Sequence, residues 1–186
     1  MMVNIIGKGQ GWENAPVEGE TWGITQLILR RPVKRVIDMN DYSLWGPVEA
    51  EEARLSRIKA MDLGIPYIDL ENYPLQEIID YFATDYFSST VDYAIALAIY
   101  ERFSEINLYG VNMSNLSEYS YQKPGVDFWC GVAIGKGINL KSHSPISTIM
   151  KTRDGLLYGY GLKQEMNNLI VHNDSKRRNE YVENNI

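Results

Sequence analysis

Segments that favour β-strands alternate with segments that favour helices along this 186-residue chain, and this alternation restricts the possible folds more than any other feature. Runs rich in Ile, Val and Tyr predict strands at residues 3–7, 34–39, 65–70, 106–111 and 138–141. Segments with a helical spacing of apolar residues lie between them, at 21–31, 46–64, 89–103 and 123–137. Strands separated by helices pair in parallel, and the helices then cover both faces of the sheet. The sequence therefore predicts an α/β fold: a single doubly wound, Rossmann-like domain with about five mainly parallel strands.

The predicted domain spans residues 1–163. After Tyr160 the composition shifts to Asn, Lys and Glu, so residues 164–186 are expected to form a peripheral C-terminal helix or a partly disordered tail. The apolar runs are shorter than the roughly 18 residues that a membrane-spanning helix needs, and the first residues lack the pattern of a signal peptide. The expected location is therefore the cytoplasm, without a membrane partner.

Charge and metal-ligand content narrow the classes of function. The net charge of −6 argues against a nucleic-acid partner, because binding to phosphates relies on Lys and Arg. Cys130 is the one cysteine, which excludes an internal disulfide framework, and His143 and His172 are the only histidines. Neither a metal nor a cofactor is expected.

Ligands of open parallel sheets bind at the carboxyl ends of the strands, where the strand order reverses, so the loops after the strands form the candidate site. The first of these loops, GKGQG, places Gly7, Gly9 and Gly11 at alternate positions. Its spacing departs from the G-x-G-x-x-G fingerprint of dinucleotide sites, and acidic residues follow it, beginning with Glu13. The loop is interpreted either as one wall of a ligand crevice or as a plain turn between a strand and a helix.

Aromatic, acidic and polar residues in these loops complete the candidate site. Aromatic rings could stack on a base or pack against protein, and Asp38 ends a strand at a position that often binds a ribose hydroxyl. Ser88 could bind phosphate or cap a helix. The predicted crevice lies between the first strand and the strand at 106–111. The residues predicted to bind the ligand are Gly7, Gly9, Gly11, Trp12, Asp38, Asp41, Trp45, Ser88, Asn112, Tyr121 and Gln122.

The stretch 124–138 carries the pattern P-G-V-x-F-x-x-G-x-A-x-G-K-G-I, followed by a strand. This pattern resembles the carboxyl-terminal helix and strand of nucleoside 2-deoxyribosyltransferase-like proteins and of the related LOG/DprA-like and TIR-like Rossmannoid groups. The resemblance implies nucleotide binding and, in many members, cleavage of an N-glycosidic bond. The catalytic glutamate of the deoxyribosyltransferases falls two residues before the helix glycine, which is Gly131 here, and this chain has Trp129 in its place.

If the chain is an enzyme, the resemblance implies hydrolysis or transfer at an N-glycosidic bond, with Asp127 or Glu13 stabilising the developing positive charge. Asp127 is equally interpreted as a first-turn acid that complements a helix dipole. Relatives commonly complete their sites across a dimer, which makes a homo-oligomer the expected assembly. The sequence leaves open whether turnover occurs.

The segments GWENAP, YQKPGVDFWCGVAIGKGI and LLYGYG also resemble parts of small uncharacterised bacteriophage proteins. That resemblance implies a phage origin and a host-cytoplasmic setting, with no established activity. Two alternatives to an enzyme therefore stay open. One is a non-catalytic sponge that sequesters a nucleotide immune signal, and the other is a protein-binding inhibitor of a host factor.

Overall fold

The computed structural model describes residues 1–113 and 119–151. The predicted boundary between residues 163 and 164 and the LLYGYG segment lie outside the described residues. Met1–Ile149 form one compact unit, to which every described helix and strand belongs.

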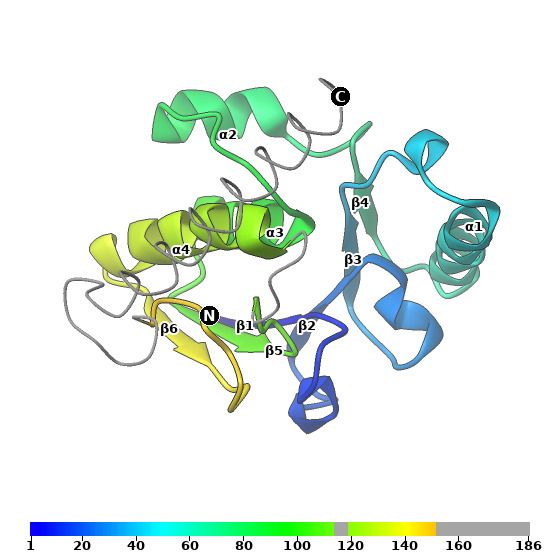
Figure 1. Cartoon of the computed structure of the whole chain (residues 1–186), viewed down its shortest axis with the longest axis horizontal. Helices are drawn as coiled ribbons and strands as arrows, with labels where there is room; N and C mark the ends of the chain where they lie inside the picture. Colours follow the sequence, from blue (N-terminus) through cyan, green and yellow to red (C-terminus); the bar gives the residue numbers. More distant parts are fainter. Residues whose placement is uncertain (114–118, 152–186) are drawn as a thin grey trace, which may run out of the picture. The chain divides into compact units, whose positions relative to one another are not determined.

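Parallel strands form one six-stranded sheet at the centre of this unit (Figure 1). The strands are β1 Met2–Ile6, β2 Glu20–Ile24, β3 Arg35–Asp38, β4 Tyr67–Asp69, β5 Glu105–Tyr109 and β6 Asn139–Ser142. Their order across the sheet is β4-β3-β2-β1-β5-β6, with every neighbouring pair parallel. The chain therefore builds outward from β1 in one direction and then returns to the other side of β1, which places the reversal between β1 and β5. The prediction of a doubly wound, Rossmann-like α/β domain is confirmed.

The sheet has one strand more than predicted because β2 occupies part of the segment expected to be a helix at 21–31, and that helix prediction is wrong. Residues of β2 pair in register with both β1 and β3, and a short 3-10 helix, η2 (Thr25–Leu29), follows. Trp22 belongs to the buried cluster on one face of the sheet, whereas Leu27 and Ile28 belong to the cluster on the other face. A short apolar run fits a strand and a helix alike, which explains the error.

Helices in the described part of the chain flank the sheet. The α-helices are α1 Pro47–Asp62, α2 Leu75–Phe82, α3 Thr90–Tyr100 and α4 Tyr119–Gly135, and two further 3-10 helices are η1 Trp12–Asn14 and η3 Tyr42–Leu44. The predicted helices at 46–64, 89–103 and 123–137 correspond to α1, α3 and α4. Pro47 opens α1 at a position where its fixed φ and missing N–H cost nothing.

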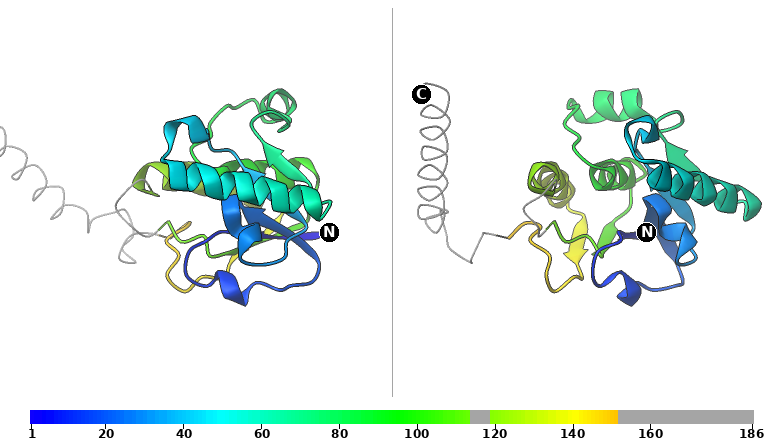
Figure 2. Two further views of the ribbon diagram at one scale, coloured as in Figure 1. Left: turned by 90° about the vertical axis from the view of Figure 1, so that its right-hand side faces the viewer. Right: turned by 45° about the vertical axis from the view of Figure 1, so that its right-hand side comes forward.

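The helices divide between the two faces of the sheet (Figure 2). α3 and α4 pack on one face, and α1 packs with η2 on the other. Along β1, Val3 and Ile5 belong to the cluster around α3, whereas Ile6 belongs to the cluster that contains Ala60 of α1. This alternation is the period of two expected of a strand that is buried on both sides.

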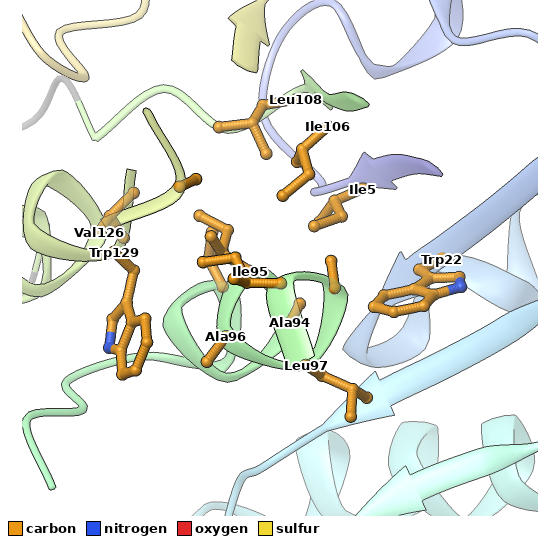
Figure 3. Close-up of a cluster of buried hydrophobic side chains, with 14 of the residues drawn as sticks. Ile5, Trp22, Ala94, Ile95, Ala96, Leu97, Ile106, Leu108, Val126 and Trp129 are labelled. Atoms are coloured by element: carbon orange, nitrogen blue, oxygen red, sulfur yellow. The ribbon is translucent and has the colours of Figure 1, made fainter. Parts of the chain in front are cut away.

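The larger cluster is centred on α3, which is buried along most of its length (Figure 3). Ile5, Ile106 and Leu108 come to it from the sheet. Trp22 lies on the β2 side of this cluster and Trp129 on the α4 side. The site described next is built at the first turn of this buried helix.

Candidate functional site

A cavity of about 470 Å³ opens at the carboxyl ends of β1, β2, β3 and β5 and at the start of α3. It lies where the strand order reverses between β1 and β5, which is the place that the sequence predicted for the crevice. We call it the switch-point cavity. The predicted ligand-binding residues that line it are Gly7, Gly9, Trp45, Ser88, Asn112 and Gln122. Gly11, Trp12 and Tyr121 are not among its lining residues, and Tyr121 is 83% exposed.

The glycines of the first loop extend the pairing of β1 with β5 beyond the strands themselves. The Gly7 N–H donates to the Tyr109 carbonyl (2.8 Å), and the Gly9 N–H donates to the Gly110 carbonyl (2.9 Å). A Cβ on Gly7 would come within 2.6 Å of the Gly110 carbonyl oxygen, and one on Gly9 within 2.7 Å. Both positions therefore need glycine for close backbone approach, and both amides are already bonded to carbonyls of the protein rather than held ready for a phosphate.

Aromatic rings and uncharged polar groups make up most of the lining of the switch-point cavity. Trp45, Phe87, Tyr93 and Tyr119 supply the rings. The amides of Asn40, Asn112 and Gln122 and the hydroxyls at residues 88–90 supply hydrogen-bonding groups. Lys8 is the one charged side chain among the described residues that line this cavity. The arrangement suits a planar, heterocyclic ligand with several polar atoms.

Lys8 and Thr25 are among the lining residues that the sequence did not predict. Lys8 sits between Gly7 and Gly9, and its place within the GKG motif was the available signal. Thr25 begins η2, inside the segment that was predicted to be helical, and it adopts a φ of 54°. Because a β-branched residue with positive φ is a conformational outlier, the backbone at Thr25, in the wall of the cavity, is strained.

Asp92 organises the first turn of α3, which borders the switch-point cavity. Its side chain is fully buried and accepts hydrogen bonds from the Ser88 and Ser89 N–H groups and from both serine hydroxyls. The Ser89 hydroxyl oxygen in turn accepts from the Asp92 N–H, which completes a capping box. Burial raises the pKa of the Asp92 carboxyl group, against the lowering effect of these hydrogen bonds. Ser88 is therefore a structural part of the helix start as well as a lining residue.

The start of α4 lies directly against this turn. The Ser88 hydroxyl is 3.0 Å from the Gln122 carbonyl oxygen, and a Cβ on Gly125 would overlap the Ser88 hydroxyl and the Asp92 carboxylate. Gly125 in the 124–138 pattern therefore has a structural reason, because α4 packs against the capped end of α3 only with glycine at this position.

A second cavity, of about 360 Å³, lies on the α1 side of the sheet, and it contains Asp38 and Asp41. Along β3, Ile37 belongs to the cluster around α3, so the alternation of the strand directs Asp38 to the opposite face. The buried Asp38 carboxylate accepts hydrogen bonds from the hydroxyls of Tyr67 (2.7 Å) and Tyr42 (3.0 Å). Asp41 caps η3 through the Ser43 N–H. We call this space the α1-side cavity.

Neither residue predicted for catalysis lines either cavity. Asp127 lies on α4 and pairs with Lys123, one helical turn earlier. Glu13 lies on η1 and is exposed. Trp129, which occupies the position of the catalytic glutamate in the resembling family, is fully buried, stacks on Phe87 and donates its indole N–H to the Tyr86 carbonyl (2.8 Å). This position therefore faces the core rather than a ligand.

Among the described residues, none of the helices combines the length and the apolar character that crossing a bilayer requires. Over the same residues, no cluster of three or more His, Cys, Asp or Glu side chains is placed to hold a metal ion.

Comparison with known proteins returns only distant structural likeness. No protein-family model matches the chain, and no curated protein matches it in sequence. The structure of the sialyltransferase CstII from Campylobacter jejuni with the substrate analogue CMP-3FNeuAc gives a TM-score of 0.40 at 14% sequence identity, over 78% of this chain and 81% of that chain. The CstII complex with cytidine-5'-monophosphate gives a TM-score of 0.36 at 16% identity, over 78% of this chain and 80% of that chain. A likeness of this size does not extend to ligand or activity, and it gives no support to either resemblance noted in the sequence.

Proposed function

We propose that this protein binds a nucleotide or a nucleotide-derived small molecule in the switch-point cavity. The observation that carries this proposal is the place of the cavity, at the reversal point of a doubly wound parallel sheet, together with a lining of aromatic rings, amides and hydroxyls. The rings of Trp45 and Tyr119 offer faces to a base, whereas Phe87 is already stacked against Tyr93 and Trp129. Asn40, Asn112 and Gln122 offer both donors and acceptors to its edges or to a sugar.

The described lining favours binding without turnover over cleavage of an N-glycosidic bond. Glycoside cleavage normally uses carboxylates placed on either side of the scissile bond. Among the described residues, the switch-point cavity has no carboxylate in its lining, and Trp129 replaces the glutamate that the resembling family uses. We therefore propose capture of an intact ligand, with hydrolysis or transfer as the alternative.

The decisive experiment is to identify what the protein carries and what becomes of it. Small molecules released by denaturing the purified protein would be identified by mass spectrometry, and ligand-free protein would then be incubated with the same molecules. Release of an intact nucleotide, unchanged by incubation, supports capture. A freed base or an altered sugar shows turnover. Protein that neither carries nucleotides nor binds any from a panel by calorimetry contradicts the proposal and favours a protein partner.

A pair of variants tests the place of binding. Trp45→Ala removes a ring that lines the switch-point cavity, and it is expected to weaken binding by roughly tenfold or more, the loss typical of a stacked base. Tyr121→Ala removes an exposed ring outside the lining and serves as the control. Equal affinities in the two variants would place the ligand elsewhere.

A further inference from the structure

A chain of hydrogen bonds runs from one cavity to the other past the carboxyl ends of β1, β2 and β3. The Lys8 ammonium, in the switch-point cavity, donates to the Gln26 side-chain carbonyl (2.7 Å). The Gln26 side-chain amide donates to the Tyr42 hydroxyl, and that hydroxyl donates to the Asp38 carboxylate (3.0 Å), in the α1-side cavity. We call these four residues the relay.

The relay has a fixed direction, because its two ends allow no other. A lysine ammonium only donates hydrogen bonds, and an ionised carboxylate only accepts them. The Gln26 amide must therefore turn its oxygen to Lys8 and its nitrogen to Tyr42, and a flip of that amide would break both bonds. Burial and the nearby Asp38 charge raise the pKa of Tyr42, so its hydroxyl keeps the proton that it donates. Gln26 is itself 7% exposed, which holds its side chain in one place.

Lys8 is the group that an anionic part of a ligand would meet. It carries the one charge among the described lining residues of the switch-point cavity. The Gly7 and Gly9 N–H groups on either side of it donate to the Tyr109 and Gly110 carbonyls. In this loop an anion would therefore contact the Lys8 ammonium rather than these two N–H groups. A phosphate on the bound molecule would accept a charge-assisted hydrogen bond from this ammonium.

We propose that Lys8 binds a phosphate group of the ligand, and that Gln26 and Tyr42 are positioning residues that hold its ammonium at the cavity wall. The inference rests on the proposed function, and it narrows the ligand class to nucleotides rather than nucleosides. Asp38 then anchors the relay from the far side of the sheet, a role different from the ribose contact that its place at a strand end predicted. In this arrangement the α1-side cavity supplies the counter-charge, and the switch-point cavity receives the ligand.

The test compares affinities for ribonucleoside 5′-monophosphates with affinities for the matching nucleosides, by calorimetry. The wild-type protein is expected to prefer the monophosphate by about tenfold, the usual worth of one charge-assisted bond. Lys8→Met is expected to abolish this preference, whereas Lys8→Arg retains most of it. Tyr42→Phe breaks the relay between Gln26 and Asp38 and is expected to reduce the preference several-fold. Tyr67→Phe removes the other phenol bonded to Asp38 and serves as the matched control, with the preference retained.

The readout separates this inference from the proposed function. A wild-type protein that binds neither monophosphates nor nucleosides overturns the proposed function and, with it, this inference. A wild-type protein that binds both, with the same preference in Lys8→Met, overturns the inference alone. If Tyr42→Phe lowers the affinities for nucleosides and for monophosphates equally, the role of Tyr42 is structural, and its assignment as a positioning residue is wrong.

Discussion

Asp92 combines two properties at a single position, complete burial and a full set of hydrogen-bond donors around its carboxylate. Asp92→Asn replaces one acceptor oxygen with an NH2 group that faces N–H donors. We expect a loss of about 2 kcal/mol in the free energy of unfolding, which urea titration measures. Asp80→Asn, at an exposed position of α2, is the control and is expected to change little.

The same residue predicts a pH dependence. Burial raises the pKa of Asp92 above its ordinary value of 3.8, so the folded state keeps this proton to a higher pH than the unfolded chain does. Its contribution to stability is complete below that ordinary value and is lost as pH rises through the raised pKa. The stability advantage of the wild type over Asp92→Asn should therefore shrink as the pH rises from the ordinary pKa of 3.8 through the raised pKa. A stability difference between the wild type and Asp92→Asn that grows with pH would contradict a raised pKa for Asp92.

Trp129 occupies the position of the catalytic glutamate in the resembling family, but its side chain belongs to the buried core. Its indole is buried against Phe87 and bonded to the Tyr86 carbonyl, so Trp129→Glu would place a carboxylate in the core instead of restoring a nucleophile. We expect this variant to lose at least about 3 kcal/mol of stability and to gain no glycosidase activity. Trp129→Phe is expected to lose less. A stable, active Trp129→Glu protein would revive the catalytic interpretation.

Helices and strands follow the sequence closely where the spacing of apolar residues fits only one of the two structures. The predicted helix at 46–64 became α1, between Pro47 and the left-handed Gly64, and Ser89 begins α3 as its cap. The β2 strand was missed because a short apolar segment fits the periods of a strand and of a helix alike.

The direction of side chains limited the prediction of the site more severely than it limited the prediction of helices and strands. Asp38 ends a strand as predicted, but the pleat turns it to the α1 side, and no feature of the sequence shows which side holds the cavity.

The contact between α3 and α4 provides a test at the level of elements. Alanine favours a helix over glycine by about 1 kcal/mol, but at position 125 the added Cβ would overlap two groups that are fixed by hydrogen bonds. The steric overlap should outweigh the gain in helix propensity, and Gly125→Ala is expected to lose about 2 kcal/mol of stability. Gly131→Ala is the matched control on the same helix, because nothing lies within 4 Å of its added Cβ, and it is expected to stabilise. Thermal unfolding of both variants decides between propensity and packing.

Opening of the whole compact unit can be followed at Cys130. The thiol is buried in the larger core cluster, and burial raises its pKa to about 12. Because the thiolate is the reactive form, alkylation at about pH 8 should be slow in the folded protein and should rise to the rate of an unfolded cysteine in urea. Urea dependence of labelling that matches the unfolding transition seen by circular dichroism supports a single cooperative unit, and rapid labelling without denaturant would contradict it.

The position of β1 at the centre of the sheet sets the order in which this protein can be assembled during synthesis. One neighbour of β1 begins at Glu20, but the other, β5, pairs Glu105 with Met2. While the ribosome makes the residues between these strands, the strand destined for the middle of the sheet has an open edge, and α3, which must cover it, is also incomplete. Contacts this far apart slow folding, and an unpaired edge invites pairing with another nascent chain. Any chain released before β5 emerges would therefore present a bare central strand, which makes premature termination in this region a direct source of aggregation.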